Sequence, residues 1–478
     1  MKAPFSAYLD SIAPAVHEIV DTLSYYYDYV SALSTDSSGL QIVISQHSKT
    51  ITNSNMTTER GTVVRVCKDG LYSEYAFDVL DPANTGSICA VIKGTLDKQI
   101  ASLKSLGVEA YTTGILSDEP LTLRVEKEAE ELPENADIEK LAEYFGRLSD
   151  SGMKEIPDAL DCQLRGVSTH ISKMFISRNR DLRQSYVYTE GSVMAFSPNE
   201  AGEPKLYYDG VSGCGGIEIL YGLEDKMKRG PQIVRDLIFA EKLVPGEYDV
   251  ITEPGITGLI AHEAFGHGVE MDMFVKERAL GKEYIGKRVG SDLVTMHEGA
   301  LCSESVTAYA FDDEGTLAGD VTEIDHGILK TGICDALSAL RLGTVPTGNG
   351  KRENFSHKVY TRMTNTVFDS GTDTLEDMIA SISFGYLLEG MDSGMEDPKH
   401  WGIQCLISRG YEIKDGKLTG KVVSPVIMTG YVPDLLGSIS MASTDRRVDG
   451  NGACGKGHKE WVKVADGGPY LKMKARLG

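Results

Sequence analysis

Residues 248–267 read Tyr248-Asp-Val-Ile-Thr-Glu-Pro-Gly-Ile-Thr-Gly-Leu-Ile-Ala-His262-Glu-Ala-Phe-Gly-His267. The β-branched residues at the start predict a strand over Glu247–Thr252, the Pro-Gly pair predicts a turn, and the apolar run predicts a buried helix. Ionisable groups on a buried helix need partners, because leaving them unpaired in an apolar environment costs free energy. Two histidines and a glutamate on this helix therefore predict a metal site.

The spacing of the two histidines departs from the common zinc-peptidase pattern. In His-Glu-x-x-His the two ligands lie four residues apart on one helix face, whereas His262 and His267 are separated by one residue more. With about 3.6 residues per turn, a regular helix would direct their rings apart. Both can reach one metal if the turn widens or the helix ends between them. Gly266 tolerates either distortion.

A catalytic zinc site usually has three protein ligands and one position for water. Glu263 follows the first histidine and is the predicted general base for zinc-activated water. Six residues are candidates for the third ligand: Cys454, His458, Glu270, His297, Glu298 and His326. Cys454 is favoured, because its glycine-rich loop can bring a thiolate close to two imidazoles, and His458 comes second.

Composition narrows the class of protein. The 478 residues are 41% hydrophobic and 25% charged, which is typical of a globular chain of two or three domains. A net charge of -22 without a dense basic stretch argues against nucleic acid as a partner. Neither a signal peptide nor an apolar run of about 18 residues is evident, so we expect no membrane span. Eight scattered cysteines predict reduced thiols in a cytoplasm.

The patterns predict an α+β fold in two parts. Residues 1–215 are expected to form an N-terminal α/β domain with a mixed or antiparallel sheet. Residues 216–478 are expected to form a largely antiparallel β domain that carries the metal-binding helix. The individual elements expected are helices over Ser6–Leu33, Gly86–Leu106, Gly216–Glu241 and Thr374–Leu387, a strand over Leu40–Gln46, a hairpin over Thr62–Phe77, and strands within Gln163–Asp209. Asp373 and Glu376 stand at capping-box spacing before the last helix.

The chain resembles the TldD/PmbA family of metallopeptidases, in its motif-bearing TldD-like branch. Six ordered matches span about 200 residues of the C-terminal half: 259–270, 312–316, 327–329, Thr347-Gly-Asn-Gly-Lys-Arg-Glu353, Arg362-Met-Thr-Asn-Thr366 and Cys454-Gly-Lys456. In the N-terminal half, Gly61–Phe77 is similar to the family's glycine-arginine hairpin. Together these motifs are far more specific than the two histidines alone.

The resemblance implies Zn²⁺ held by His262, His267 and Cys454, with Glu263 as general base. It implies a two-domain chain that forms a homodimer, or a heterodimer with a PmbA-like paralogue, around an enclosed proteolytic chamber. The implied substrates are unfolded or extended peptides, which would pair with a strand edge. The family is also labelled a modulator of DNA gyrase, although the acidic charge gives no support for DNA contact.

Several polar residues in the matched motifs are candidate peptide ligands: Arg362, Asn365, Asn349 and Arg352. A hydrogen-bonded structural role is the alternative for each of them. Glu270 is a candidate partner that orients His267. Residues 390–401 replace a glycine-rich stretch usual in the family and are expected to line the cleft. Trp401 in this segment is interpreted as a structural aromatic, with a substrate platform as the alternative.

Two other functions stay open. The first is a non-catalytic peptide-binding subunit, since the family includes partner subunits that lack the His-Glu motif. The second is a zinc hydrolase that acts on small amide bonds. His262 and Glu263 are both present, which favours the peptidase.

Overall fold

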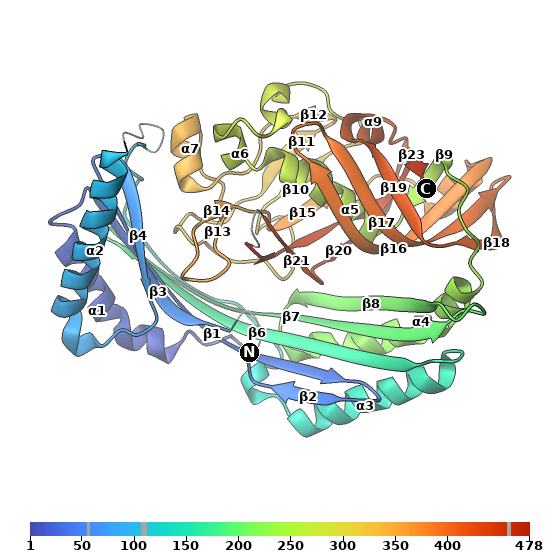
Figure 1. Ribbon diagram of the computed structural model, residues 1–478, viewed down its shortest axis with the longest axis horizontal. Helices are drawn as coiled ribbons and strands as arrows, with labels where there is room; N and C mark the ends of the chain where they lie inside the picture. The colour runs from blue at the N-terminus through green and yellow to red at the C-terminus, as the bar shows by residue number, and fades with distance from the viewer. Residues whose placement is uncertain (55–57, 107–111, 457–459) are drawn as a thin grey trace.

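The computed structural model describes residues 1–54, 58–106, 112–456 and 460–478 and consists of two sheets, each with its own helices (Figure 1). The N-terminal sheet lies below, and the C-terminal sheet and a loop-rich segment lie above it (Figure 1). This arrangement confirms the predicted α+β class.

The N-terminal sheet has eight strands in the order β4-β3-β1-β6-β7-β5, with β2 beside β1 and β8 beside β7. Only the β5–β7 pair is parallel, so the sheet is mixed, as expected. Its strands are β1 (Tyr29–Ile44), β2 (Lys49–Thr52), β3 (Arg60–Lys68), β4 (Leu71–Phe77), β5 (Leu121–Glu126), β6 (Asp161–Ser177), β7 (Arg180–Pro198) and β8 (Pro204–Cys214). Strands β1, β6 and β7 are long and pair along most of their length.

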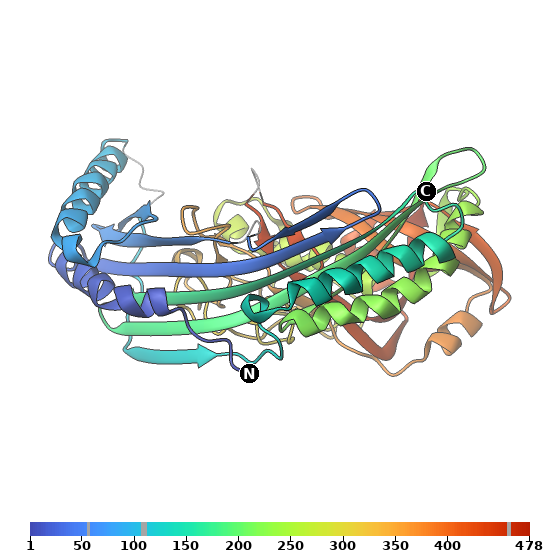
Figure 2. The same ribbon diagram turned by 90° about the horizontal axis from the view of Figure 1, so that it is seen from below.

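Two pairs of helices pack on this sheet, at opposite ends (Figure 2). Helices α1 (Ala7–Leu23) and α2 (Thr85–Ser105) bury their apolar faces against residues of β1, β3 and β6. Helices α3 (Ile138–Glu155) and α4 (Leu223–Ile238) pack against β1, β6 and β7. Helix α4 comes after residue 215 in the chain but packs with the N-terminal sheet. The predicted domain boundary between residues 215 and 216 stays a prediction.

The C-terminal sheet has eleven strands, mostly antiparallel. The path is β12-β11-β10-β15-β23-β19-β17-β16-β9, and the parallel pairs are β15–β23 and β16–β9. The strands are β9 (Gly246–Thr252), β10 (Met296–Glu298), β11 (Val321–Asp325), β12 (Ile328–Leu329), β15 (Asn365–Phe368), β16 (Phe384–Asp397), β17 (Gly402–Lys414), β18 (Lys417–Val423), β19 (Val426–Tyr431), β20 (Met441–Asp449) and β23 (Ala465–Leu477).

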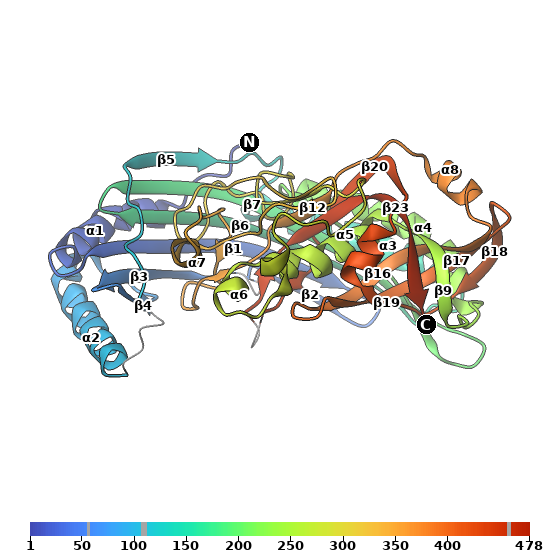
Figure 3. The same ribbon diagram turned by 90° about the horizontal axis from the view of Figure 1, so that it is seen from above.

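Two small hairpins and five short helices complete this part of the chain. The hairpins pair β13 (Gly350–Lys351) with β14 (Tyr360–Thr361), and β21 (Ala453–Cys454) with β22 (Val462–Lys463). The helices are α5 (Pro254–Ala261), α6 (Asp272–Val275), α7 (Ala336–Leu342), α8 (Leu375–Ala380) and α9 (Val432–Gly437). Figures 1 and 3 place α6, α7 and the first hairpin over the N-terminal sheet.

Two of the predicted helices are too long. The first ends at Leu23, because residues from Tyr29 onward are buried in β1 between β3 and β6. The last ends at Ala380, because the chain after Phe384 pairs with β9 and β17. Its N-cap is Thr374, whose hydroxyl accepts the Asp377 N–H, and not the predicted Asp373. In both cases tertiary pairing overrides the helical pattern.

No helix in the described part of the chain is long and apolar enough to cross a membrane.

Candidate metal centre

The predicted buried helix widens at the metal motif. Helix α5 begins at Pro254, packs on β23 and β16, and continues as one π-helical turn over His262–Gly266. The N–H of His267 bonds to the carbonyl of His262, five residues back, instead of four. A π turn closes hydrogen bonds between residues i and i+5 and commonly occurs at functional sites. The widened turn thus brings histidines five residues apart to one side of the helix.

His262, His267 and Cys454 come together at this turn. One ligand-type atom from each lies within 4.8 Å of the other two. The Nε2 of His267 is 3.2 Å from the Cys454 Sγ, and the two imidazole rings have centroids 5.0 Å apart at 86°. Two imidazole nitrogens and one sulfur form a donor set that suits zinc and leaves room for water as a fourth ligand. The residues present therefore fit a zinc ion.

Cys454 reaches the helix from the β21–β22 hairpin. Its strand partner is Val462, and its side chain packs with Met363 and Ile333. Burial raises the pKa of the Cys454 thiol, but the nearby imidazoles of His262 and His267 outweigh this effect and lower it to about 4. The thiolate is the form that binds metals.

His267 is held by a chain of buried charges. Its Nδ1 is 3.1 Å from a carboxylate oxygen of Glu270, as the sequence predicted for an orienting partner. Lys456 Nζ lies 3.1 Å from the same oxygen, and Arg362 Nε lies 3.4 Å from the other. Burial alone would raise the pKa of the Glu270 carboxyl. Lys456, His267 and Arg362 outweigh this effect and hold the pKa well below its usual value. A carboxylate on the far nitrogen fixes the ring and directs the other nitrogen toward the ligand position.

His262 has a weaker partner on its far side. Its Nδ1 lies 3.9 Å from Asp466 Oδ2, and this nitrogen makes no hydrogen bond within the described residues. Burial raises the pKa of the Asp466 carboxyl to about 7. Asp466 was missed in the sequence, because it lies on β23, 204 positions further along the chain, with no motif around it.

Glu263 lies in a cleft of about 600 Å³ beside the three ligand-type side chains. Its pKa is raised, because burial outweighs the two histidines. Gly394 of β16 lies against it, since a Cβ at that position would be 2.6 Å from the Glu263 Cγ. Residues 391–396 line the cleft, as expected for the segment that departs from the family.

The cleft holds a second carboxyl that the sequence did not single out. Glu396 has both carboxyl oxygens buried without a hydrogen bond to a described residue, and burial raises its pKa to about 9. Trp401, by contrast, is fully buried against Phe265 and Tyr284, which agrees with the structural interpretation. The exposed tryptophan of this chain is Trp461, which lines the cleft.

Three of the other third-ligand candidates lie away from the metal centre. His297 pairs with Asp320 at 2.8 Å, His326 bonds to the Asp292 carbonyl, and Glu298 accepts hydrogen bonds from Thr364 and Thr366. Glu270 contacts His267 as described. His458 lies outside the described residues.

The four candidate peptide ligands are buried and bonded within the protein. Arg362 donates to the carbonyls of Cys454 and Glu460, which makes it a positioning residue for the cysteine hairpin. Asn349 and Asn365 are fully buried and bond to neighbouring side chains and carbonyls. Arg352 pairs with Glu74 and borders a different cavity. These contacts agree with the structural alternative, and a role in substrate binding stays a prediction.

Comparison with known proteins identifies relatives of the C-terminal half. Residues 245–475 match the PmbA/TldA metallopeptidase C-terminal domain. Over 236 residues the chain is 32% identical to a metalloprotease TldD homolog of Buchnera aphidicola, covering 49% of this chain and 48% of that protein. It is 30% identical over 232 residues to a zinc metalloprotease TldD homolog of Saccharolobus solfataricus, covering 48% and 51%. The match spans about half the length of these curated relatives.

Two solved structures share the fold of nearly the whole chain. A protein from Thermotoga maritima described as a modulator of a DNA gyrase superposes with a TM-score of 0.76 and 16% identity, covering 98% of this chain and all of that one. TldE from Thermococcus kodakarensis superposes with a TM-score of 0.74 and 18% identity, covering 97% and 100%. At these identities the likeness establishes the fold alone.

Proposed function

On the premise that this chain belongs to the TldD/PmbA family of metallopeptidases, we propose that it hydrolyses peptide bonds at a zinc ion held by His262, His267 and Cys454. The observation that carries the proposal is the meeting of these three side chains, with ligand-type atoms within 4.8 Å of one another, beside Glu263. The metalloprotease names of the relatives support the same reaction class.

The proposed mechanism assigns a task to each residue. A zinc ion at this site would lower the pKa of water and polarise the scissile carbonyl. The Glu263 carboxylate accepts the proton of the attacking water and returns it to the leaving amine. Burial raises the pKa of Glu263, which makes it a stronger base than an exposed carboxylate. Glu270 and Arg362 hold His267 and the Cys454 hairpin in place.

The proposed substrate is an unfolded or extended peptide that pairs with the free edge of β16. Within the described chain, β9 pairs with β16 over Gly385–Leu388, whereas residues 390–397 on that edge have no strand partner. Gly394, in this segment, lies against Glu263. An extended peptide added to this edge would pass the general base, with main-chain hydrogen bonds supplying affinity.

The proposal includes an assembly and a compartment. The chain would act as a homodimer, or as a heterodimer with a PmbA-like paralogue, and the fold shared with TldE supports the second form. Its eight cysteines are free thiols, which fits the reducing conditions of a cytoplasm.

The decisive experiment is Glu263→Gln. We expect the variant to keep its zinc and to lose cleavage of an unfolded protein by at least about 100-fold, the usual contribution of a general base. Metal analysis and a cleavage assay with and without chelator measure both properties. Glu376→Gln, an exposed carboxyl on α8, is the matched control. Undiminished cleavage by Glu263→Gln would overturn the mechanism. A metal-free, inactive parent would favour the non-catalytic peptide-binding subunit.

A further inference from the structure

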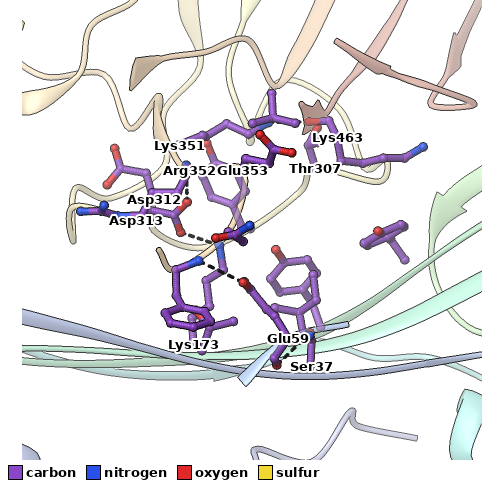
Figure 4. Close-up of a pocket in the computed structure, with 18 of the residues that line it drawn as sticks. Ser37, Glu59, Lys173, Thr307, Asp312, Asp313, Lys351, Arg352, Glu353 and Lys463 are labelled. Atoms are coloured by element: carbon purple, nitrogen blue, oxygen red, sulfur yellow. Dashed lines mark hydrogen bonds and ion pairs between the residues drawn. The ribbon is translucent and has the colours of Figure 1, made fainter. Parts of the chain in front are cut away.

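A second cavity of about 450 Å³ lies between the N-terminal sheet and the C-terminal loops (Figure 4). Strands β1, β6 and β7 form one wall, with Lys173 and Tyr186 among their side chains. The other wall is formed by residues 351–356 and 461–463. This volume is in the usual range for small-molecule binding sites. The metal chemistry described above uses none of the charged side chains that line it.

Five cationic side chains line this cavity, and four of them are neutralised by a carboxylate. The pairs are Arg60 with Asp36, Lys173 with Asp313, Arg352 with Glu74, and Lys463 with Glu190. The fifth, Lys351, has no ion pair with any described residue. Its ammonium donates to the backbone carbonyls of Met363 and Lys463.

Lys351 is therefore a buried amine without an ion-pair partner among the described residues. Its exposed fraction is 8%. An ammonium has three N–H donors, and two of them are used by the carbonyls, so one is left for a ligand. Burial and the charge of Arg362 lower the pKa of Lys351 to about 7, against the opposite effect of the Glu298 and Asp313 carboxylates. A carboxylate that entered the cavity would supply the missing counterion in a charge-assisted hydrogen bond.

Glu59 is the opposite case. Its carboxylate accepts the N–H of Phe355 at 2.9 Å and forms no ion pair with a residue that the structure describes. Among the other acidic groups of the lining, Asp313 pairs with Lys173 and Glu353 lies 3.3 Å from His357. Asp312 accepts the backbone N–H groups of Glu314, Thr316 and Gly350, and Asp78 is exposed. Figure 4 shows Glu59 on the side of the N-terminal sheet and Lys351 on the side of the C-terminal loops. The cavity thus has Lys351 on one wall and Glu59 on the opposite wall, neither in an ion pair with a described residue.

We propose that this cavity binds a short peptide through its two free ends, with the C-terminal carboxylate at Lys351 and the terminal ammonium at Glu59. A zwitterion of this size neutralises both charges at once, whereas a simple anion or cation neutralises one and leaves the other. Tyr186, which borders the cavity and donates no hydrogen bond to a described residue, is a further donor for the peptide backbone.

The two cavities meet at one residue. Trp461 lines the cavity and also the cleft of the metal centre, with its indole packed on Gly455, the residue after Cys454. Its exposed fraction is 45%. The bound peptide is therefore assigned as the fragment that leaves the metal centre, and this assignment, unlike the binding itself, rests on the proposed function.

Calorimetric titration of the full chain with trialanine tests the binding, with trialanine amide and N-acetyl-trialanine as the end-blocked probes. Glu263→Gln protein prevents turnover. We expect trialanine to bind about tenfold or more tightly than either blocked peptide, since each block removes one charged hydrogen bond. Lys351→Met should abolish the difference between trialanine and its amide. Glu59→Gln should abolish the difference between trialanine and the acetylated peptide.

The controls separate this site from the metal centre. Lys463→Met, which removes a neutralised cation of the same wall, should weaken all three peptides equally. Binding and its end preference should persist in the presence of chelator. Loss of the carboxylate preference on chelation would place the carboxylate on the metal and overturn the proposal. Equal binding of the three peptides, or no binding at millimolar concentration, would also overturn it. These outcomes do not depend on whether the parent chain cleaves peptides.

If Lys351→Met fails to fold, the Glu59→Gln variant and the end-blocked peptides still test whether the cavity binds the two peptide ends.

Discussion

At the scale of single residues, Cys454 has the least typical environment in the candidate site. Its sulfur lies 3.2 Å from an imidazole that is 187 positions away in the chain. A cysteine buried in apolar surroundings is normally a neutral thiol, whereas here two histidines lower its pKa to about 4. None of the other seven cysteines belongs to a candidate metal-binding group in the described part of the chain. They are therefore suitable control positions for substitutions of Cys454.

Cys454→Ala is therefore expected to bind zinc weakly. Two imidazoles remain, which is one protein ligand fewer than a catalytic zinc site usually has. Metal analysis after dialysis should give a zinc content far below one equivalent. Cys214→Ala, a free cysteine away from the site, should match the parent. Full zinc occupancy in Cys454→Ala would contradict the assignment and direct attention to His458.

At the scale of elements, the π turn after α5 determines whether the two histidines can act together. Gly266 closes this turn and has a φ of -65°, so its backbone does not need glycine. Its surroundings do, because a Cβ there would be 2.2 Å from the Met363 sulfur. The sequence indicated glycine as a tolerant point for backbone distortion, whereas the structure shows that the constraint is space.

Gly266→Ala should thus destabilise the protein by about 1–3 kcal/mol, the usual cost of overpacking a buried site. Because the added methyl group displaces Met363, beside Cys454, the variant should also lose zinc affinity. Thermal unfolding and metal titration measure the two effects. Gly255→Ala at the start of the same helix has nothing within 4 Å of the added Cβ and should be close to neutral. Equal behaviour of the two variants would contradict the steric account.

Helices α1 and α8 are both shorter than the sequence predicted. Helical periodicity correctly indicated α1 and α8, but it did not reveal that the residues after them join a sheet. Burial on both sides of a central strand can outweigh local propensity, and no local pattern reports it.

At the scale of the whole molecule, charged side chains connect the two units. Glu74 of β4 receives hydrogen bonds from Arg65 of the neighbouring strand and from Arg352 of the C-terminal loops, with its carboxylate 2.6 Å from both. Burial raises the pKa of Glu74, but the two guanidinium groups outweigh it and lower the pKa from 4.5 to about 2. Folding is therefore linked to the ionisation of this carboxyl.

A group whose pKa is lower in the folded state stabilises the protein above its unfolded pKa and loses that contribution as the pH falls toward the folded value. Glu74 should contribute about 3 kcal/mol at neutral pH, at about 1.4 kcal/mol per pKa unit. Glu74→Gln should accordingly lower the melting temperature at pH 7, and the difference from the parent should shrink between about pH 5 and pH 2.

Melting curves across this pH range check the prediction. Glu143→Gln, an exposed carboxyl on α3, should show no such dependence. A difference between Glu74→Gln and the parent that grows with acidity would reverse the sign and refute the linkage.

The sequence by itself determined the α+β class, the buried helix with its two histidines and glutamate, and the need for either a widened turn or a helix end between the histidines. Each depends on residues near one another in the chain, where periodicity and side-chain chemistry act directly. It also ranked Cys454 first as third ligand, from thiolate chemistry and a glycine-rich loop.

The tertiary structure alone decided which distant groups face one another. Asp466 beside His262, Trp461 at the cleft instead of Trp401, and the opposed charges of Lys351 and Glu59 follow from how the sheets and loops pack. Such contacts depend on strand register and on the burial of whole faces. The residues next to a given residue in the sequence do not determine its strand register or which face is buried. The same lysine or tryptophan can therefore be a structural group in one fold and a candidate ligand site in another.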